Sequence, residues 1–102
     1  MRRFSLFLLL FAAISSTGLA SELAASQAKV EIFVTSWCSY CRKLEAFLKQ
    51  NQIQYTRYDV EADTKAAETF DKLGGTGVPL VRVGDQVIHG YDPEQVLAAL
   101  KT

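Results

Sequence analysis

The chain has 102 residues, which is enough for one small domain. Hydrophobic residues make up 49% of the sequence and charged residues 22%, and these proportions are ordinary for a globular protein. The 11 Lys and Arg residues balance 11 Asp and Glu residues, so the formal net charge is zero. No run of basic residues stands out, and the composition therefore gives no support to nucleic-acid binding.

The first 20 residues have the pattern of a secretory signal peptide. Arg2 and Arg3 precede an almost wholly apolar run at residues 4–14, and the small residues Gly18 and Ala20 fit a cleavage site after Ala20. The alternative is an uncleaved membrane anchor, but crossing a bilayer takes about 20 apolar residues and this run is shorter. The sequence therefore predicts a signal peptide at residues 1–20, a flexible lead-in at 21–28 and one domain at 29–102.

The first half of this domain is predicted to form a strand, a helix and a second strand. Residues 29–35 (KVEIFVT) alternate and are β-branched, which predicts a strand with Val30, Ile32 and Val34 on one face. The helix that follows the cysteines has apolar residues at helical spacing and ends near residues 51–52. Residues 53–60 (IQYTRYDV) predict the second strand. The apolar residues of the helix are Cys41, Leu44, Phe47 and Leu48.

A second helix is predicted at residues 64–73, and a pair of glycines ends it. Two strands follow at residues 78–84 and 86–90. A tight turn at Asp85 joins them, so they are expected to form an antiparallel hairpin. The helix residues predicted to face the core are Ala66, Phe70 and Leu73.

The last helix begins with Asp92 as its N-cap and Pro93 as its first residue. The element order is therefore β-α-β-α-β-β-α. A right-handed crossover makes the first two strands parallel, whereas the hairpin is antiparallel. The sequence predicts an α/β fold in which helices flank a mixed four-stranded sheet. The residues of the last helix that are predicted to pack inward are Val96, Leu97 and Leu100.

The segment TSWCSYC at residues 35–41 contains both cysteines of the chain. Cys38 stands where the first strand passes into the first helix, and the free N–H groups and dipole of a helix N-terminus stabilise an anion. Thiols at such places ionise readily, so Cys38 is the predicted attacking thiol. Cys41 lies in the first turn and is expected to be more buried. It suits the resolving role, in which it attacks a mixed disulfide and releases the product.

Other roles for the cysteine pair stay open. A structural disulfide across so short a loop constrains the unfolded chain little, because loop-closure entropy grows with loop length. A structural zinc site needs four Cys or His ligands, and the chain offers Cys38, Cys41 and His89 only. His89 is predicted to be a structural or solvent-facing residue at the sheet edge. A dimer could instead share a metal ion or an iron–sulfur cluster, with Cys38 from each chain.

Pro79 stands at the start of the third predicted strand, in the segment TGVP. A Pro is tolerated at the first residue of a strand because the N–H there needs no partner. A cis Val78–Pro79 peptide bond would turn the Val78 backbone toward an extended partner. The trans form is the ordinary alternative, and the residues themselves leave both open.

Three motifs in this order, CSYC at residues 38–41, TGVP at 76–79 and HGYD at 89–92, resemble the glutaredoxin branch of the thioredoxin superfamily. The resemblance extends over about residues 29–101. It implies a thioredoxin-like fold, a cis Val78–Pro79 bond facing the cysteines, and thiol–disulfide oxidoreductase activity with Cys38 as nucleophile. Family members commonly use glutathione as co-substrate. The residues implied to bind the substrate are Trp37, Tyr40, Val78, Pro79, Gly90, Tyr91 and Asp92.

Several residues differ from the usual family pattern. Trp37 precedes the first Cys as in thioredoxins, and Thr35 stands where many members have a Lys that pairs with a glutathione carboxylate. Ser39 replaces a common Pro, and members with a small residue there sometimes bridge an iron–sulfur cluster as dimers. The segment GYDP at residues 90–93 is similar to glutaredoxin-like proteins that accept electrons from thioredoxin reductase. The electron donor is therefore left open between glutathione and such a relay.

The resemblance and the signal peptide together predict an exported protein in an oxidising compartment, the bacterial periplasm or an equivalent. The expected partners are glutathione and disulfide-containing proteins, with no nucleic acid and, after signal cleavage, no membrane. We expect a monomer without a tightly bound cofactor. The alternative is a dimeric binding module that uses Cys38 and glutathione to hold an iron–sulfur cluster or a metal ion. The sequence leaves the direction open between reductase, oxidase and isomerase.

Overall fold

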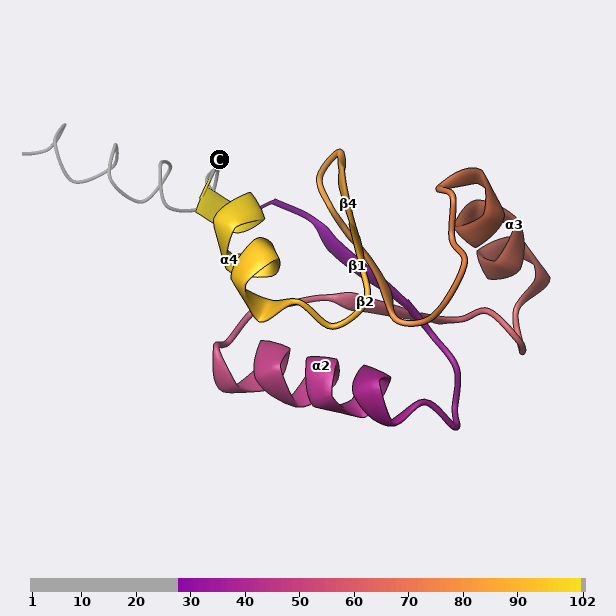
Figure 1. Ribbon diagram of the computed structural model, residues 1–102, viewed down its shortest axis with the longest axis horizontal. Coiled ribbons are helices and arrows are strands. Elements are labelled where there is room, and N and C mark those ends of the chain that lie inside the picture. Colours follow the sequence, from indigo (N-terminus) through magenta and orange to yellow (C-terminus); the bar gives the residue numbers. More distant parts are fainter. Residues whose placement is uncertain (1–27, 102) are drawn as a thin grey trace, which may run out of the picture.

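The computed structural model describes residues 28–101, so the predicted signal peptide and nearly all of the lead-in lie outside the described residues. The strands and helices follow one another in the predicted order (Figure 1). No helix in this part of the chain is long and apolar enough to cross a membrane. The bounds are β1 Val30–Val34, α2 Ser39–Gln50, β2 Thr56–Asp59, α3 Thr64–Lys72, β3 Leu80–Val83, β4 Gln86–His89 and α4 Pro93–Lys101.

The sheet has the strand order β2-β1-β3-β4. β1 runs parallel to β2, with Ile32 opposite Arg57, and antiparallel to β3, with Ile32 opposite Val81. β3 and β4 form the predicted antiparallel hairpin. The mixed four-stranded α/β sheet is therefore confirmed, with β1 and β3 at its centre.

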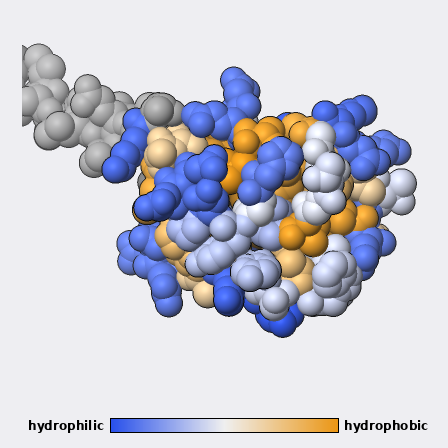
Figure 2. Space-filling view, in the orientation of Figure 1, coloured by the Kyte–Doolittle hydropathy of each residue, from blue (hydrophilic) through white to orange (hydrophobic). Residues whose placement is uncertain are grey.

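One face of the sheet packs against α2 and α4. The apolar spacing along α2 turns one stripe of the helix toward β1, and Leu44 and Leu48 are completely buried there. Outside this core, hydrophilic residues make up much of the surface in Figure 2, with smaller apolar areas between them. The buried cluster consists of Val30, Ile32, Val34, Cys38, Cys41, Leu44, Leu48, Val81, Val83, Ile88, Val96 and Ala99.

The other face of the sheet packs against α3, which lies well apart from α2 and α4 in Figure 1. Phe33 stacks on Tyr58 with ring centroids 5.2 Å apart, and it meets Phe70 of α3 at 6.4 Å. Beside these rings lies Glu31, which is 5% exposed. Its carboxylate accepts hydrogen bonds from Arg82 Nε at 2.7 Å and from the Tyr58 hydroxyl at 3.2 Å. This face is therefore part aromatic and part ionic.

The second and third strands are shorter than predicted. β2 lacks the first three predicted residues because the chain there still completes the end of α2. The Ile53 N–H donates to the Leu48 carbonyl at 2.9 Å, and Gln52 has a left-handed φ of 57°. β3 begins two residues later than predicted, because Val78 and Pro79 form a cis peptide bond that leads into the strand.

The start of α4 is confirmed, whereas one of its predicted core residues is wrong. Asp92 Oδ1 accepts the Gln95 N–H at 3.1 Å, and Pro93 is the first helical residue. Leu97 is 38% exposed, and Ala99 instead is buried at 4%. Each residue turns an α-helix by about 100°, so a neighbour of a buried position points away from the core.

Candidate active site

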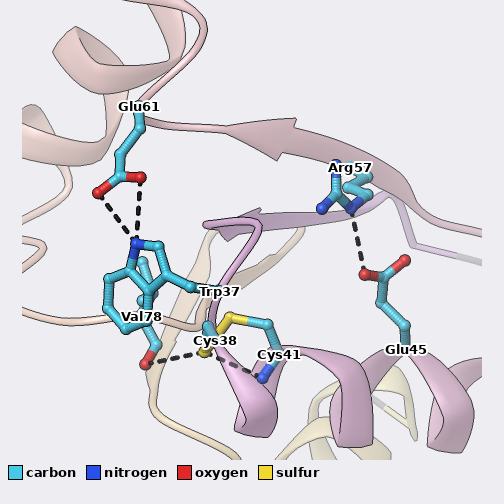
Figure 3. Close-up of a disulfide and its surroundings, with 7 residues drawn as sticks. All are labelled: Trp37, Cys38, Cys41, Glu45, Arg57, Glu61 and Val78. Atoms are coloured by element: carbon cyan, nitrogen blue, oxygen red, sulfur yellow. Dashed lines mark hydrogen bonds and ion pairs between the residues drawn. A yellow bond between two sulfur atoms is a disulfide. The ribbon is translucent and has the colours of Figure 1, made fainter.

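Cys38 and Cys41 lie at the N-terminus of α2 and form a disulfide, with Cα atoms 5.2 Å apart (Figure 3). Cys38 is the N-cap residue, and its carbonyl accepts the Arg42 N–H at 3.3 Å. Both cysteines are buried, at 5% exposed for Cys38 and 1% for Cys41. The predicted placement, with the second cysteine deeper in the first turn, is confirmed.

Two groups approach the Cys38 sulfur. The Cys41 N–H donates to Sγ at 3.1 Å, so the sulfur takes the place that a Ser or Asp oxygen usually has at an N-cap. The Val78 carbonyl oxygen lies 3.9 Å from Sγ, where the S–H of reduced Cys38 can donate to it. The N–H donor and the positive end of the helix dipole both stabilise negative charge on this sulfur.

The Val78–Pro79 peptide bond is cis and lies beside Cys38, as the resemblance implies, although 40 residues separate Cys38 from Val78. Pro79 is buried, and its carbonyl accepts the Gly90 N–H at 2.9 Å. Gly90 has a φ of 83°, which glycine adopts without steric cost. Through these contacts the fold joins all three sequence motifs into one site.

Three aromatic residues of the predicted binding set are exposed next to the cysteines. Trp37 is 65% exposed, Tyr40 57% and Tyr91 38%. The Tyr40 and Tyr91 rings have centroids 6.3 Å apart, and Lys43 Nζ lies 5.0 Å from the Tyr40 ring centroid, within cation–π range. Exposed aromatic rings offer a large apolar area to a partner.

The polar residues predicted near the site differ in their hydrogen bonds and in their exposure. The Asp92 carboxylate caps its own helix, since it accepts both the backbone N–H of Gln95 at 3.1 Å and its Nε2–H at 2.7 Å. His89 is exposed at the end of β4, as predicted. Thr35 is 4% exposed, and its Oγ1 has no hydrogen-bond partner within residues 28–101. In the same range, no three His, Cys, Asp or Glu side chains gather as a metal site.

The shifted pKa values and two cavities lie elsewhere. Cavities of about 310 and 260 Å³ include Tyr55 and Glu31 among their lining residues, and neither includes a predicted site residue. Burial and the hydrogen-bonded carboxylate of Glu45 together raise the pKa of Tyr55 to about 12. Burial alone raises the pKa of the Glu31 carboxyl, but Arg82, Lys29 and Tyr58 together outweigh burial, and the pKa is lowered. The cysteines thus lie next to exposed aromatic residues and line neither cavity.

Residues 30–88 match the family model for glutaredoxin. The chain belongs to the glutaredoxin family. It is 30% identical over 66 residues to a glutaredoxin of Pseudomonas aeruginosa, covering 62% of this chain and 76% of the relative. A Mycobacterium tuberculosis protein that carries the glutaredoxin name is 38% identical over 60 residues, covering 57% of this chain and 71% of that protein.

Solved structures confirm the thioredoxin-like fold of this glutaredoxin-family protein. A mutant of a thioredoxin-like protein superposes with a TM-score of 0.66 at 26% identity, covering 71% of this chain and 99% of the other. The NrdH-redoxin of Escherichia coli superposes with a TM-score of 0.64 at 20% identity, covering 69% and 92%. That glutaredoxin-like protein is described as having a thioredoxin-like activity profile. The chain is thus a glutaredoxin-family protein with the thiol oxidoreductase fold and its cysteine pair at disulfide distance.

Glu61 contacts the predicted site, and the sequence did not point to it. The Trp37 indole Nε1–H donates to both Glu61 carboxylate oxygens, each at 3.1 Å (Figure 3). The two residues are 24 apart, and Glu61 stands in the turn between β2 and α3. No local pattern marks such a residue, because the contact depends on how this turn packs beside the cysteine loop.

Proposed function

We propose that this glutaredoxin is a dithiol thiol–disulfide oxidoreductase that acts on protein disulfides and glutathione mixed disulfides, with glutathione as co-substrate. The position of the Cys38 sulfur carries the proposal. As the N-cap of α2 it accepts the Cys41 N–H at 3.1 Å. A thiolate is favoured at such a position, and the adjacent Val78 backbone offers a partner a place to bind.

The proposed reaction moves two electrons from the cysteine pair to a partner disulfide. The Cys38 thiolate attacks one partner sulfur, the partner S–S bond breaks, and the other partner sulfur leaves as a thiolate that takes a proton from water. Cys41, having lost its proton to solvent, then attacks Cys38 Sγ and releases the second partner thiol. With Cα atoms 5.2 Å apart, the pair closes its own disulfide within the ordinary range of backbone separations.

The predicted binding residues would hold glutathione across this site. Its backbone would pair with Val78, and its γ-glutamyl end would lie near residues 90–92. Tyr40 would line the groove. Lys43 Nζ, 5.0 Å from the Tyr40 ring centroid, supplies a cation for a glutathione carboxylate in place of the family Lys that Thr35 replaces.

The predicted signal peptide supports export of this protein to an oxidising compartment such as the bacterial periplasm. We propose that it acts there as a monomer. The direction of exchange there depends on the electron donor. If glutathione or a thioredoxin-reductase-like relay supplies electrons, the cysteine pair would reduce the disulfides of its partners. Without a donor it would pass its own disulfide to them, and a more stable Cys38 thiolate would make it the stronger oxidant.

The redox equilibrium of the purified protein in glutathione buffers tests this proposal. Free thiols are alkylated at each ratio of reduced to oxidised glutathione, and the products are weighed by mass spectrometry. We expect a potential in the glutaredoxin range, about −200 to −230 mV, with a glutathione adduct on Cys38 as an intermediate.

Two other results would change the proposal. A potential near about −120 mV would indicate a disulfide donor and not a glutathione-linked reductase. A pair that stays oxidised at every buffer ratio, with no adduct, would contradict glutathione as co-substrate and favour a structural disulfide.

A further inference from the structure

Trp37 is 65% exposed, yet its indole ring is held in one orientation. Its Nε1–H is shared between the two carboxylate oxygens of Glu61 at 3.1 Å each (Figure 3). Hydrogen bonds to a charged acceptor are stronger than those between neutral groups. The ring next to the reactive cysteine is thus open to a partner and already ordered.

The turn that carries Glu61 is itself fixed. Asp59 Oδ1 accepts the N–H groups of Glu61 at 2.9 Å and of Ala62 at 3.1 Å. The Val60 N–H donates to the Val34 carbonyl at 3.0 Å, which ties this turn to the end of β1. The carboxylate that holds the indole therefore stands on a closed turn beside the strand that leads to the cysteines.

We propose that Glu61 is a positioning residue that holds the Trp37 ring in place as a docking surface for a polypeptide partner. The negative charge of Glu61 also disfavours glutathione on this side of Cys38. The inference rests on the proposed function and specifies its preferred substrate class, a protein disulfide. Ordering a free side chain on binding costs free energy, and a ring that is already held avoids this cost. Trp is also among the residues that contribute most to protein interfaces.

The aromatic residues next to the cysteines contact side chains of opposite charge. Trp37 reaches toward Glu61 in the turn before α3, whereas Tyr40 lies toward Tyr91, before α4, with Lys43 Nζ at 5.0 Å from its ring centroid. Glutathione carries a net negative charge, and charge repulsion extends about 8 Å at physiological ionic strength. A protein disulfide within a neutral or basic segment meets no such repulsion at Glu61.

Fluorescence tests the positioning role directly, because Trp37 is the one Trp of the chain. Time-resolved anisotropy of the reduced protein compares the wild type with Glu61→Ala and Glu61→Gln. We expect faster local motion of the indole in Glu61→Ala. In Glu61→Gln the amide oxygen still accepts the Nε1–H, so the ring should move much less than in Glu61→Ala. Glu68→Ala, at an exposed position of α3, is the matched control and should change nothing.

Kinetics test the substrate class. With insulin as the protein disulfide and dithiothreitol as reductant, we expect Glu61→Ala to raise KM about three- to tenfold while kcat stays within about twofold. Glu61→Gln should keep the wild-type KM for insulin. It should react about two- to threefold faster with a small glutathione mixed disulfide, because the charge is gone.

An unchanged insulin KM in Glu61→Ala, or an indole that is as immobile there as in the wild type, would overturn the proposal. Equal effects of Glu61→Gln and Glu61→Ala on insulin KM would also overturn it, since charge and not position would then be responsible. A wild-type protein that exchanges neither substrate contradicts the proposed function, and anisotropy then decides the positioning role by itself.

Discussion

The face of the sheet toward α2 and α4 is apolar, whereas the face toward α3 has an ion pair beside its aromatic rings. On the first face, β1 meets helical side chains such as Leu44, which is completely buried. On the second, the same strand presents Phe33 and Glu31, and the Glu31 carboxylate is paired with Arg82. One strand is thus buried on both sides by different means.

The two faces of the sheet stabilise different parts of the fold. Apolar packing fixes α2, and with it the two cysteines at its N-terminus, through many contacts that need no hydrogen-bond partner. The ion pair joins neighbouring strands, because Glu31 stands opposite Arg82 in the pairing of β1 with β3. Substitutions on the two faces should therefore differ in size and in their dependence on pH.

The largest effect is expected on the apolar face. Leu44→Ala should lower the free energy of unfolding by about 2–5 kcal/mol, because the removed side chain leaves a cavity under α2. Leu97→Ala, at a position that is 38% exposed, is the matched control and should cost less than about 1 kcal/mol. Urea unfolding followed by circular dichroism measures both. Equal losses would show that the core is not where we place it, and Leu44→Val, which leaves a smaller cavity, replaces Leu44→Ala if that variant does not fold.

A smaller effect is expected on the ionic face. Glu31→Gln should cost about 1–3 kcal/mol, because it leaves Arg82 without its charged partner. The cost stays below that of a fully buried pair, since the Arg82 side chain is 31% exposed. The double variant Glu31→Leu, Arg82→Leu removes both charges and should be closer to the wild type. A double variant less stable than Glu31→Gln would contradict this account.

The ion pair also predicts how stability depends on pH. Burial raises the pKa of the Glu31 carboxyl, but the hydrogen bond and charge of Arg82, with Lys29 and Tyr58, bring it below its ordinary value of 4.5. Since the folded-state pKa is the lower one, the carboxylate stabilises the fold above the unfolded pKa, and this is lost as pH falls through the folded pKa. Urea midpoints should therefore fall less steeply in acid for Glu31→Gln. Identical acid profiles would contradict the assignment.

The smallest effect is expected at the polar edge of the α2 face. The Tyr55 hydroxyl donates to Glu45 Oε1 at 2.8 Å, and Tyr55→Phe should cost about 0.5–1.5 kcal/mol. Burial and this carboxylate raise the pKa of Tyr55 to about 12, so its contribution is lost as pH rises through that value. Tyrosinate absorbance should show a step near pH 12 that Tyr55→Phe removes and Tyr40→Phe retains. A step near pH 12 that persists in Tyr55→Phe would contradict its assignment to Tyr55.

Much of the fold could be predicted because each element has a local cause. Alternation defines β1, and the apolar spacing of α2 defines its buried stripe. The sequence predictions fail where contacts between different elements determine the structure. The N–H of Ile53 is used to finish α2 before β2 can begin. Alternation predicts that Val30, Ile32 and Val34 share one face of β1, but it could not show that Glu31, on the other face, is only 5% exposed beside α3 and Arg82.

The candidate site was predictable to the extent that its residues stand in motifs. Cys38, Val78 and Gly90 are far apart in sequence, and the contacts described above bring them together. Glu61 could not be predicted, because a lone acidic residue in a turn gives no sign that an indole 24 residues away will donate to it. The roles assigned to the binding residues stay predictions.

Trapping of the mixed disulfide tests the order of attack by the two cysteines most directly. The protein carrying Cys41→Ser is incubated with a disulfide substrate, and its adducts are located by mass spectrometry, with Cys38→Ser as the matched variant. A Ser at position 38 can still cap α2, so the fold should persist. We expect a stable adduct on Cys38 in Cys41→Ser, and neither adduct nor exchange in Cys38→Ser. An active Cys38→Ser with its adduct on Cys41 would contradict it.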